Sequence, residues 1–206
     1  MAPKLERFPL FPLGLVLLPG EAVPLHIFEE RYKLMVGRCL DERSEFGILW
    51  LSDDGLQEVG CTARIVQVLE RFDDGRLSIL VKGMTRFGLL RRIEDMPYPA
   101  GDVELLEDDP QAPDAGAATA ARERYAEIVE RVTDERPATE ELAALDAYTM
   151  AASLEVAPEA KQQLLELRTE QERLERLSEL LSETVDQLNR AEQAAERARS
   201  NGSVRG

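Results

Sequence analysis

The sequence is poor in the residues that most often bind metals or cross-link a chain. Its 206 residues include one histidine, His26, and two cysteines, Cys39 and Cys61. A zinc site needs four ligands, usually from such side chains, and disulfide frameworks belong to cysteine-rich secreted chains. The two cysteines lie in apolar surroundings, and we interpret them as buried thiols in a reducing compartment. We therefore expect no metal and no cofactor.

Positive charge and long apolar runs are also scarce. Aspartate and glutamate number 40 against 25 lysine and arginine residues, a net charge of −15. Nucleic acids and anionic membranes attract proteins through lysine and arginine, so neither is expected as a partner. No apolar run approaches the roughly 20 residues of a membrane span, and the N-terminus lacks the pattern of a signal peptide. We expect a cytoplasmic protein.

Motifs for phosphate binding and nucleophilic catalysis are missing as well. In the segment LGLVLLPG, Gly14 and Gly20 are separated by five residues instead of the four of a phosphate loop, and Glu21 stands where its lysine should be. No serine has the setting of a nucleophile elbow. His26 lies within an expected strand, where a hydrogen bond to main chain is the ordinary role. We predict no catalytic residue, and a free-standing hydrolase that uses His26 remains an alternative.

The first half of the chain has the pattern of a strand-rich domain. Short apolar or alternating runs are separated by turns rich in glycine, aspartate and proline, such as Asp73-Asp74-Gly75. The expected strands are Val16–Leu18, Val23–Phe28, Phe46–Leu51, Thr62–Leu69, Leu77–Val81, Thr85–Arg92 and Asp102–Leu106.

One helix is expected within this strand-rich half, over Glu29–Glu42. Tyr32, Met35, Val36 and Cys39 recur there at the spacing of a single buried helix face. Together these patterns predict a compact, barrel-like sheet over residues 1–106.

The second half changes to a helical pattern and becomes strongly acidic. Residues 107–118 have a linker composition, residues 119–198 are expected to form a helical subdomain, and residues 199–206 a disordered tail. In the last helix, leucines recur every seven residues from Leu167 to Leu188, but the second row of a leucine zipper is poor. We favour packing within the subdomain over dimerisation, which leaves a monomer or a weak dimer, with a structural dimerisation protein as a further alternative.

Several ordered sequence blocks resemble the N-terminal domain of Lon-type proteases. They include FPLFPL at residues 8–13, VLLPG at 16–20, PLHIFE at 24–29 and GMTRF at 83–87, with KQQLLE at 161–166 in the helical half. The resemblance spans about residues 7–190. It implies an α+β fold with a PUA-like β pseudo-barrel and one inserted helix, followed by an α-helical subdomain that ends in a long helix.

The resemblance also implies a function. In Lon this region helps to recognise unfolded substrates, and the ATPase and Ser–Lys peptidase modules follow it. We therefore expect a stand-alone bacterial form without these modules, acting as a non-catalytic adaptor or regulator in protein quality control. The expected partners are unfolded or partly folded polypeptides, together with a protease or a chaperone.

A peptide-binding surface is expected around the first block and the start of the first helix. Two prolines in the segment Phe8–Leu13 argue against a central strand, so some of its side chains are expected to face outward. The alternative is that they fill the barrel, and an isolated surface ion pair is the simpler role for Glu29 and Arg31. The candidate binding residues are Phe8, Phe11, Leu13, Phe28, Glu29, Arg31 and Tyr32.

Overall fold

The structure is a computed structural model in which residues 3–110 and 112–202 are described. The chain forms two compact units. The sheet unit consists of the residues up to Asp109 together with Ala151–Arg168. The helical unit consists of Pro110–Met150 together with the chain from Thr169 onward.

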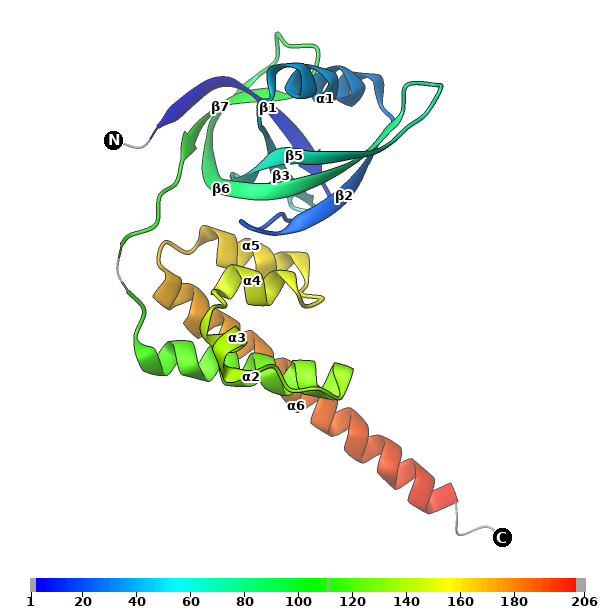
Figure 1. Cartoon of the computed structure of the whole chain (residues 1–206), viewed down its shortest axis with the longest axis vertical. Helices are drawn as coiled ribbons and strands as arrows, with labels where there is room; N and C mark the ends of the chain where they lie inside the picture. Colours follow the sequence, from blue (N-terminus) through cyan, green and yellow to red (C-terminus); the bar gives the residue numbers. More distant parts are fainter. Residues whose placement is uncertain (1–2, 111, 203–206) are drawn as a thin grey trace. The chain divides into compact units, whose positions relative to one another are not determined.

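The sheet unit is built on seven strands that close on themselves (Figure 1). The hydrogen-bonded order is β1-β7-β6-β5-β3-β4, β2 pairs with β6, and an additional pairing of β1 with β3 closes the sheet. The α+β fold with a β pseudo-barrel and one inserted helix is thereby confirmed. The elements are β1 (Lys4–Leu13), β2 (Ala22–Ile27), α1 (Glu30–Glu42), β3 (Phe46–Ser52), β4 (Gly55–Leu56), β5 (Val59–Arg71), β6 (Leu77–Ile93) and β7 (Ala100–Leu105).

The proline-rich segment at the N-terminus is a strand of the barrel, and the expectation that its two prolines keep part of it out of regular strand pairing was wrong. In β1, residues 4–5 and 8–9 pair with β7, with a register shift between them, and residues 10–13 pair with β3. Because the first half of β1 pairs only with β7 and the second half only with β3, each half has one edge that faces no paired strand. Pro9 and Pro12 are tolerated there, since a proline whose nitrogen faces an unpaired edge removes no ladder hydrogen bond.

The long strand β6 replaces two expected strands, and a loop crosses it at Gly83. Gly83 donates a hydrogen bond to the Glu21 carbonyl at 2.8 Å and accepts one from the Gly20 amide at 2.9 Å. Val16–Leu18, expected as a strand, is a buried loop segment that passes over β6 at this point. A side chain at residue 83 would collide with this loop, so glycine permits the close approach.

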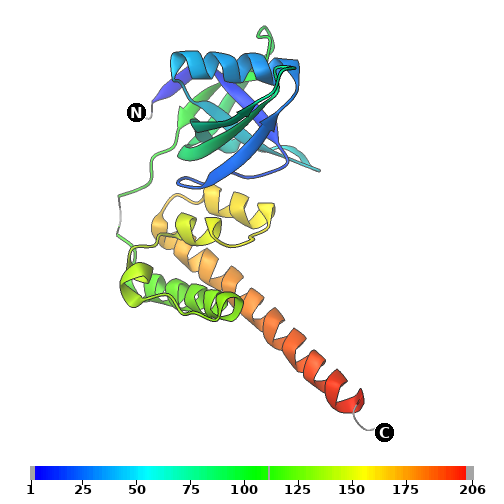
Figure 2. The same cartoon turned by 45° about the vertical axis from the view of Figure 1, so that its right-hand side comes forward.

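Helix α1 confirms the prediction from its periodicity. It begins at Glu30, one residue later than expected, and ends where Arg43 adopts a left-handed conformation. The four residues on its predicted inner face are all buried, namely Tyr32, Met35, Val36 and Cys39. The helix lies across one end of the closed sheet in both views (Figures 1 and 2).

Helix α5 (Pro158–Glu166) belongs to the sheet unit, although the sequence predicted it as part of a helical subdomain. Two largely buried charges explain the difference. Lys161 forms an ion pair with Glu21 at 2.5 Å, with both side chains less than 15% exposed. The buried guanidinium of Arg86 donates to the carbonyls of Leu165 and Leu167 at 2.9 and 2.7 Å. These long-range contacts could not be read from a change in periodicity.

The helical unit contains α2 (Ala115–Thr133), α3 (Thr139–Ala143) and the long α6 (Glu170–Gly202), while α4 (Ala147–Ala152) contributes residues to both units. Helix α2 packs along α6, and α6 continues beyond it (Figure 2). The expected linker of residues 107–118 is shorter in the structure, because the Asp114 side chain caps α2 at Ala115. Of the expected tail, residues 199–202 belong to α6, and residues 203–206 lie outside the described part.

The leucines that recur every seven residues near the end of the chain do not all lie on one face of α6. Leu174 and Leu181 are buried, together with Leu177 and Val185. Leu167 lies outside α6, at the C-terminal cap of α5. Leu174 and Leu181 are therefore used for packing within the protein, whereas Leu188 is half-buried.

Both cysteines are buried free thiols. Burial raises the pKa of Cys61 to about 12 and also raises the pKa of Cys39. Since only the thiolate attacks a disulfide reagent, we expect neither thiol to react with an aromatic disulfide at pH 8 in the folded protein. Both should react within seconds in concentrated urea. Rapid labelling of one thiol without denaturant would contradict this placement.

Candidate functional site

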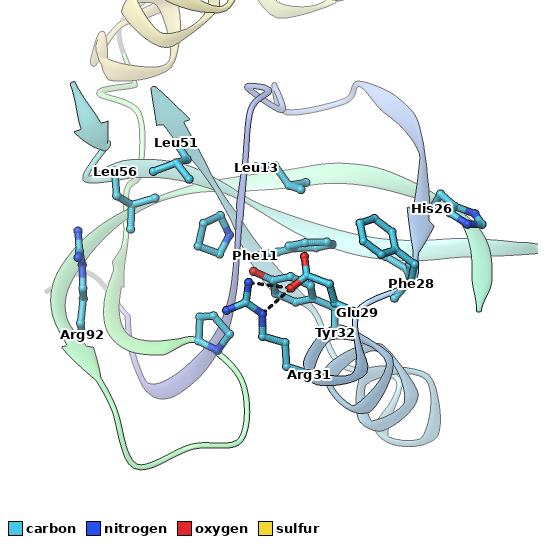
Figure 3. Close-up of a pocket in the computed structure, with 13 residues that line it drawn as sticks. Phe11, Leu13, His26, Phe28, Glu29, Arg31, Tyr32, Leu51, Leu56 and Arg92 are labelled. Carbon is cyan, nitrogen blue, oxygen red and sulfur yellow. Dashed lines mark hydrogen bonds and ion pairs between the residues drawn. The ribbon is translucent and has the colours of Figure 1, made fainter. Parts of the chain in front are cut away.

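A half-open pocket of about 510 Å³ lies in the sheet unit beside the start of α1 (Figure 3). Four segments converge there: the end of β1, the β2–α1 junction, the β3–β4 hairpin and the end of β6 with the approach to β7. The lining is mainly aromatic, aliphatic and proline residues, with four polar side chains. The lining residues are Phe11, Pro12, Leu13, His26, Ile27, Phe28, Glu29, Arg31, Tyr32, Leu51, Leu56, Arg92 and Pro99.

The floor of the pocket is a pair of buried aromatic rings. The rings of Phe11 and Tyr32 lie 4.1 Å apart, and each residue is 5% exposed. Phe11 also packs against Phe46 in the barrel core. Burial raises the pKa of Tyr32, and the neighbouring Arg31 opposes that shift. Because both rings are fixed from below, the floor offers a rigid apolar surface.

The rim of the pocket carries apolar side chains that are unusually accessible. Phe28 is 61% exposed and Leu51 is 51% exposed. Leu13 and Leu56 are half-buried beside them. Each buried Å² of apolar surface contributes roughly 25 cal/mol, so a ligand that covers these groups gains binding energy from them.

The polar groups of the pocket include one internal ion pair and one separate arginine. Arg31 binds the Glu29 carboxylate at 2.8 Å, and its guanidinium lies 4.6 Å from the centre of the Tyr32 ring. Glu29 is the N-cap of α1, but its side chain makes no capping hydrogen bond. Arg92 is exposed and lies beside Leu56 in Figure 3, at a different side of the pocket from Arg31.

Six of the seven candidate residues from the sequence line this pocket, and Phe8 does not. Phe8 packs edge-to-face on Phe87 at 6.1 Å, against the core cluster that contains Leu10 and Val103. Phe11 and Tyr32 are buried and form the floor of the pocket, so they are not exposed binding groups. Six of the residues chosen from the sequence therefore lie around one pocket, but the sequence did not show which of their side chains stay accessible.

Several lining residues were not among the candidates. Leu51 and Leu56 flank the Asp53-Asp54-Gly55 turn, and a hairpin there brings its two arms together, so this signal was available. Arg92 had no local signal. It reaches the pocket only because the closed sheet brings the ends of β1 and β6 to the same place.

His26 lies at the margin of the pocket and contacts a serine. Its Nδ1 is 3.1 Å from the Ser78 Oγ, and its ring packs with Phe28 and Phe72. The expected hydrogen bond to main chain is thus replaced by one to a side chain. Ser78 lies in β6 between β2 and β5, so its backbone belongs to the sheet. Among the described side chains, no carboxylate forms a hydrogen bond with His26.

The described part of the chain contains neither a metal-binding cluster nor a membrane-spanning helix. Within residues 3–110 and 112–202, no group of three or more histidine, cysteine, aspartate or glutamate side chains is arranged to hold a metal ion. Over the same part of the chain, no helix combines the length and apolar character needed to cross a bilayer.

Known proteins with similar sequences include bacterial Lon proteases. The chain is 27% identical over 203 residues to Lon protease 1 of Hydrogenovibrio crunogenus, covering 90% of this chain and 24% of that protein. It is 32% identical over 142 residues to Lon protease 2 of Herpetosiphon aurantiacus, covering 65% of this chain and 17% of that protein. The chain thus spans about a quarter or less of the length of these relatives.

Solved structures with the same fold cover most of the chain. A Lon N-terminal domain protein from Xanthomonas campestris aligns with a TM-score of 0.66 and 28% identity, over 84% of this chain and 97% of that one. The N-terminal domain of a Mycobacterium avium complex Lon protease aligns with a TM-score of 0.64 and 20% identity, over 86% and 98% of the two chains. The model of the ATP-dependent protease La (LON) substrate-binding domain matches residues 7–183, so the chain belongs to this family.

Proposed function

We propose that this protein binds unfolded or partly folded polypeptide segments in the pocket beside α1, without catalysing a reaction on them. The observation that carries the proposal is an apolar pocket whose floor is rigid and whose rim exposes Phe28 and Leu51. Membership of a substrate-binding domain family supports the same class of ligand. The biological role is that of an adaptor or regulator in protein quality control, which presents such segments to a protease or a chaperone.

The pocket suits an extended segment better than a folded surface. A folded protein buries its large apolar side chains, whereas an unfolded segment offers them individually to a cavity of this size. Binding is weak, because a flexible segment loses conformational entropy when it becomes ordered. Weak binding fits a protein that must release the segment to another component.

A hydrolase is the second candidate, because His26 and Ser78 lie within hydrogen-bonding distance. Two features argue against it. Ser78 sits in the middle of a sheet, where its amide is available for strand pairing rather than for an oxyanion. In the part of the chain that the structure describes, no acid orients the His26 ring. We therefore interpret the hydrogen bond between His26 and Ser78 as a structural contact on the surface of the sheet.

Removing the exposed rim should weaken binding without unfolding the protein. We expect Phe28→Ser and Leu51→Ser each to reduce affinity for an unfolded model protein about fivefold, because each deletes roughly 1 kcal/mol of apolar burial. The measurement is a fluorescence anisotropy titration with a labelled, reduced and carboxymethylated protein. Phe11 and Tyr32 are unsuitable for this test, since both are buried and their loss would disturb the core.

The matched control for these variants is Leu34→Ser. Leu34 is 53% exposed on α1 but does not line the pocket. It therefore tests whether any loss of exposed apolar surface has the same effect. Circular dichroism must show the wild-type fold for all three variants. Unchanged affinity in both rim variants, or an equal loss in the control, would place the binding surface elsewhere.

A further inference from the structure

The arginines around the pocket differ in whether an acid neutralises them. Arg31 is paired with Glu29 at 2.8 Å. Arg7 is paired with Asp95 at 3.1 Å, and Arg91 with Asp102 at 2.6 Å. Arg92, by contrast, forms no ion pair with any acid among the described residues. The pocket therefore carries one uncompensated positive charge in a chain whose net charge is −15.

The position of Arg92 makes this charge available to a ligand. Its side chain is exposed, it lines the pocket, and it lies beside the apolar Leu56 (Figure 3). A guanidinium offers a planar set of donors that matches the two oxygens of a carboxylate. A segment bound over the apolar floor could place a carboxylate at this edge of the pocket.

We propose that the pocket selects unfolded segments in which an aspartate or glutamate lies close to a large apolar side chain, and that Arg92 binds that carboxylate. This inference rests on the proposed function, because it names the kind of segment that the same pocket prefers. The apolar side chain supplies most of the affinity. The ion pair between Arg92 and the carboxylate makes acidic apolar segments dissociate more slowly than other apolar segments.

An internal acidic side chain fits the site better than a C-terminal carboxylate. Proteins usually capture a chain terminus with a group of free backbone amides. Arg92 is paired with Gly101 of β7, so it presents a side chain rather than such a group of amides. The uncapped first turn of α1 is the other place for an anion, but the Glu29 carboxylate lies there. The exposed Arg92 side chain can therefore bind the carboxylate of an internal residue that the segment places at this edge of the pocket.

The test compares three labelled peptides that share one apolar sequence and differ at a single internal position. That position holds glutamate, glutamine or lysine, and both ends of each peptide are blocked. For the wild-type protein we expect the glutamate peptide to bind about two- to fivefold more tightly than the glutamine peptide, the range of an exposed ion pair. The lysine peptide should bind most weakly. The preference should fall as salt is raised, because salt screens exposed charges.

Two variants show which arginine causes the preference. Arg92→Gln should bind the glutamate and glutamine peptides equally. Arg91→Gln is the matched control, since it changes the net charge equally and is the neighbouring residue of β6. Arg91 is bound to Asp102 and does not line the pocket, so this variant should keep the preference. An additional glutamine peptide with a free C-terminal carboxylate should bind no better than its blocked form.

The outcomes separate this inference from the function on which it rests. Equal binding of the three blocked peptides by the wild-type protein would overturn the role of Arg92 and leave the apolar pocket in place. A preference that survives in Arg92→Gln, or disappears in Arg91→Gln, would also overturn it. If the glutamine peptide with the free C-terminus bound more tightly than its blocked form, the pocket would recognise a C-terminal carboxylate and not an internal acidic side chain. Binding of none of the peptides would reject the proposed function and this inference with it.

Discussion

Gly83→Ala is expected to lower the free energy of unfolding of the sheet unit by more than about 3 kcal/mol, the upper end of overpacking effects. A Cβ at this position would fall on the carbonyl oxygen of Leu18 and lie 3.1 Å from the Leu17 Cγ. The first of these neighbours is backbone, which no side-chain rotation can move. The loop that crosses β6 would have to shift, together with its two hydrogen bonds to Gly83.

The matched control for this substitution is Gly88→Ala in the same strand. A Cβ at residue 88 would meet only the Leu106 Cδ2, at 3.9 Å, which is ordinary contact. Urea unfolding followed by Trp50 fluorescence measures both variants. Trp50 is the only tryptophan of the sequence and lies in β3, so it reports on the sheet unit. Similar losses in the two variants would show that the crossing loop yields easily.

Arg86→Met is expected to destabilise the sheet unit by about 3 kcal/mol, because it removes one partner from a buried charged network. The Arg86 side chain is 4% exposed and binds Asp108 at 2.5 Å, in addition to the carbonyls of Leu165 and Leu167. Methionine keeps much of the volume but donates no hydrogen bond. The carbonyls of Leu165 and Leu167 would then lose their hydrogen bonds from Arg86, and the methionine side chain would lie beside them instead. The same Trp50 titration measures the effect.

The matched control for Arg86 is Arg91→Met. Arg91 also lies in β6 and also pairs with an aspartate, but its side chain is 71% exposed. Exposed ion pairs contribute about 0–1 kcal/mol, so this variant should change stability little. A small effect at Arg86 would mean that α5 remains attached to the sheet through its other contacts.

Elements whose pattern is local were predictable from the sequence. The face of α1 follows from side chains three and four residues apart, which a helix brings together without help from distant segments. The strands β2 and β3 were also expected close to their observed positions. For these elements, the same residues that define the local pattern also form the buried surface.

Elements that depend on distant partners were not predictable in the same way. The two prolines of β1 predicted an irregular segment. The observed strand pairs with β7 in its first half and with β3 in its second, and nothing in its own sequence indicates this change of partner. In the pocket, the residues at the β2–α1 junction could be grouped from the sequence because they are neighbours along the chain. Arg92 was missed because only closure of the sheet brings it to them.

The discontinuous sheet unit also affects how the protein can fold during synthesis. Strands β1 to β7 are complete at Leu105, but α5 follows only after residues 110–150, which belong to the other unit. Until α5 is made, Glu21 lacks Lys161 and Arg86 lacks two of its three acceptors. Domains of a growing chain usually fold in order from the N-terminus. Here the first unit to begin folding cannot be finished until the ribosome has passed residue 168.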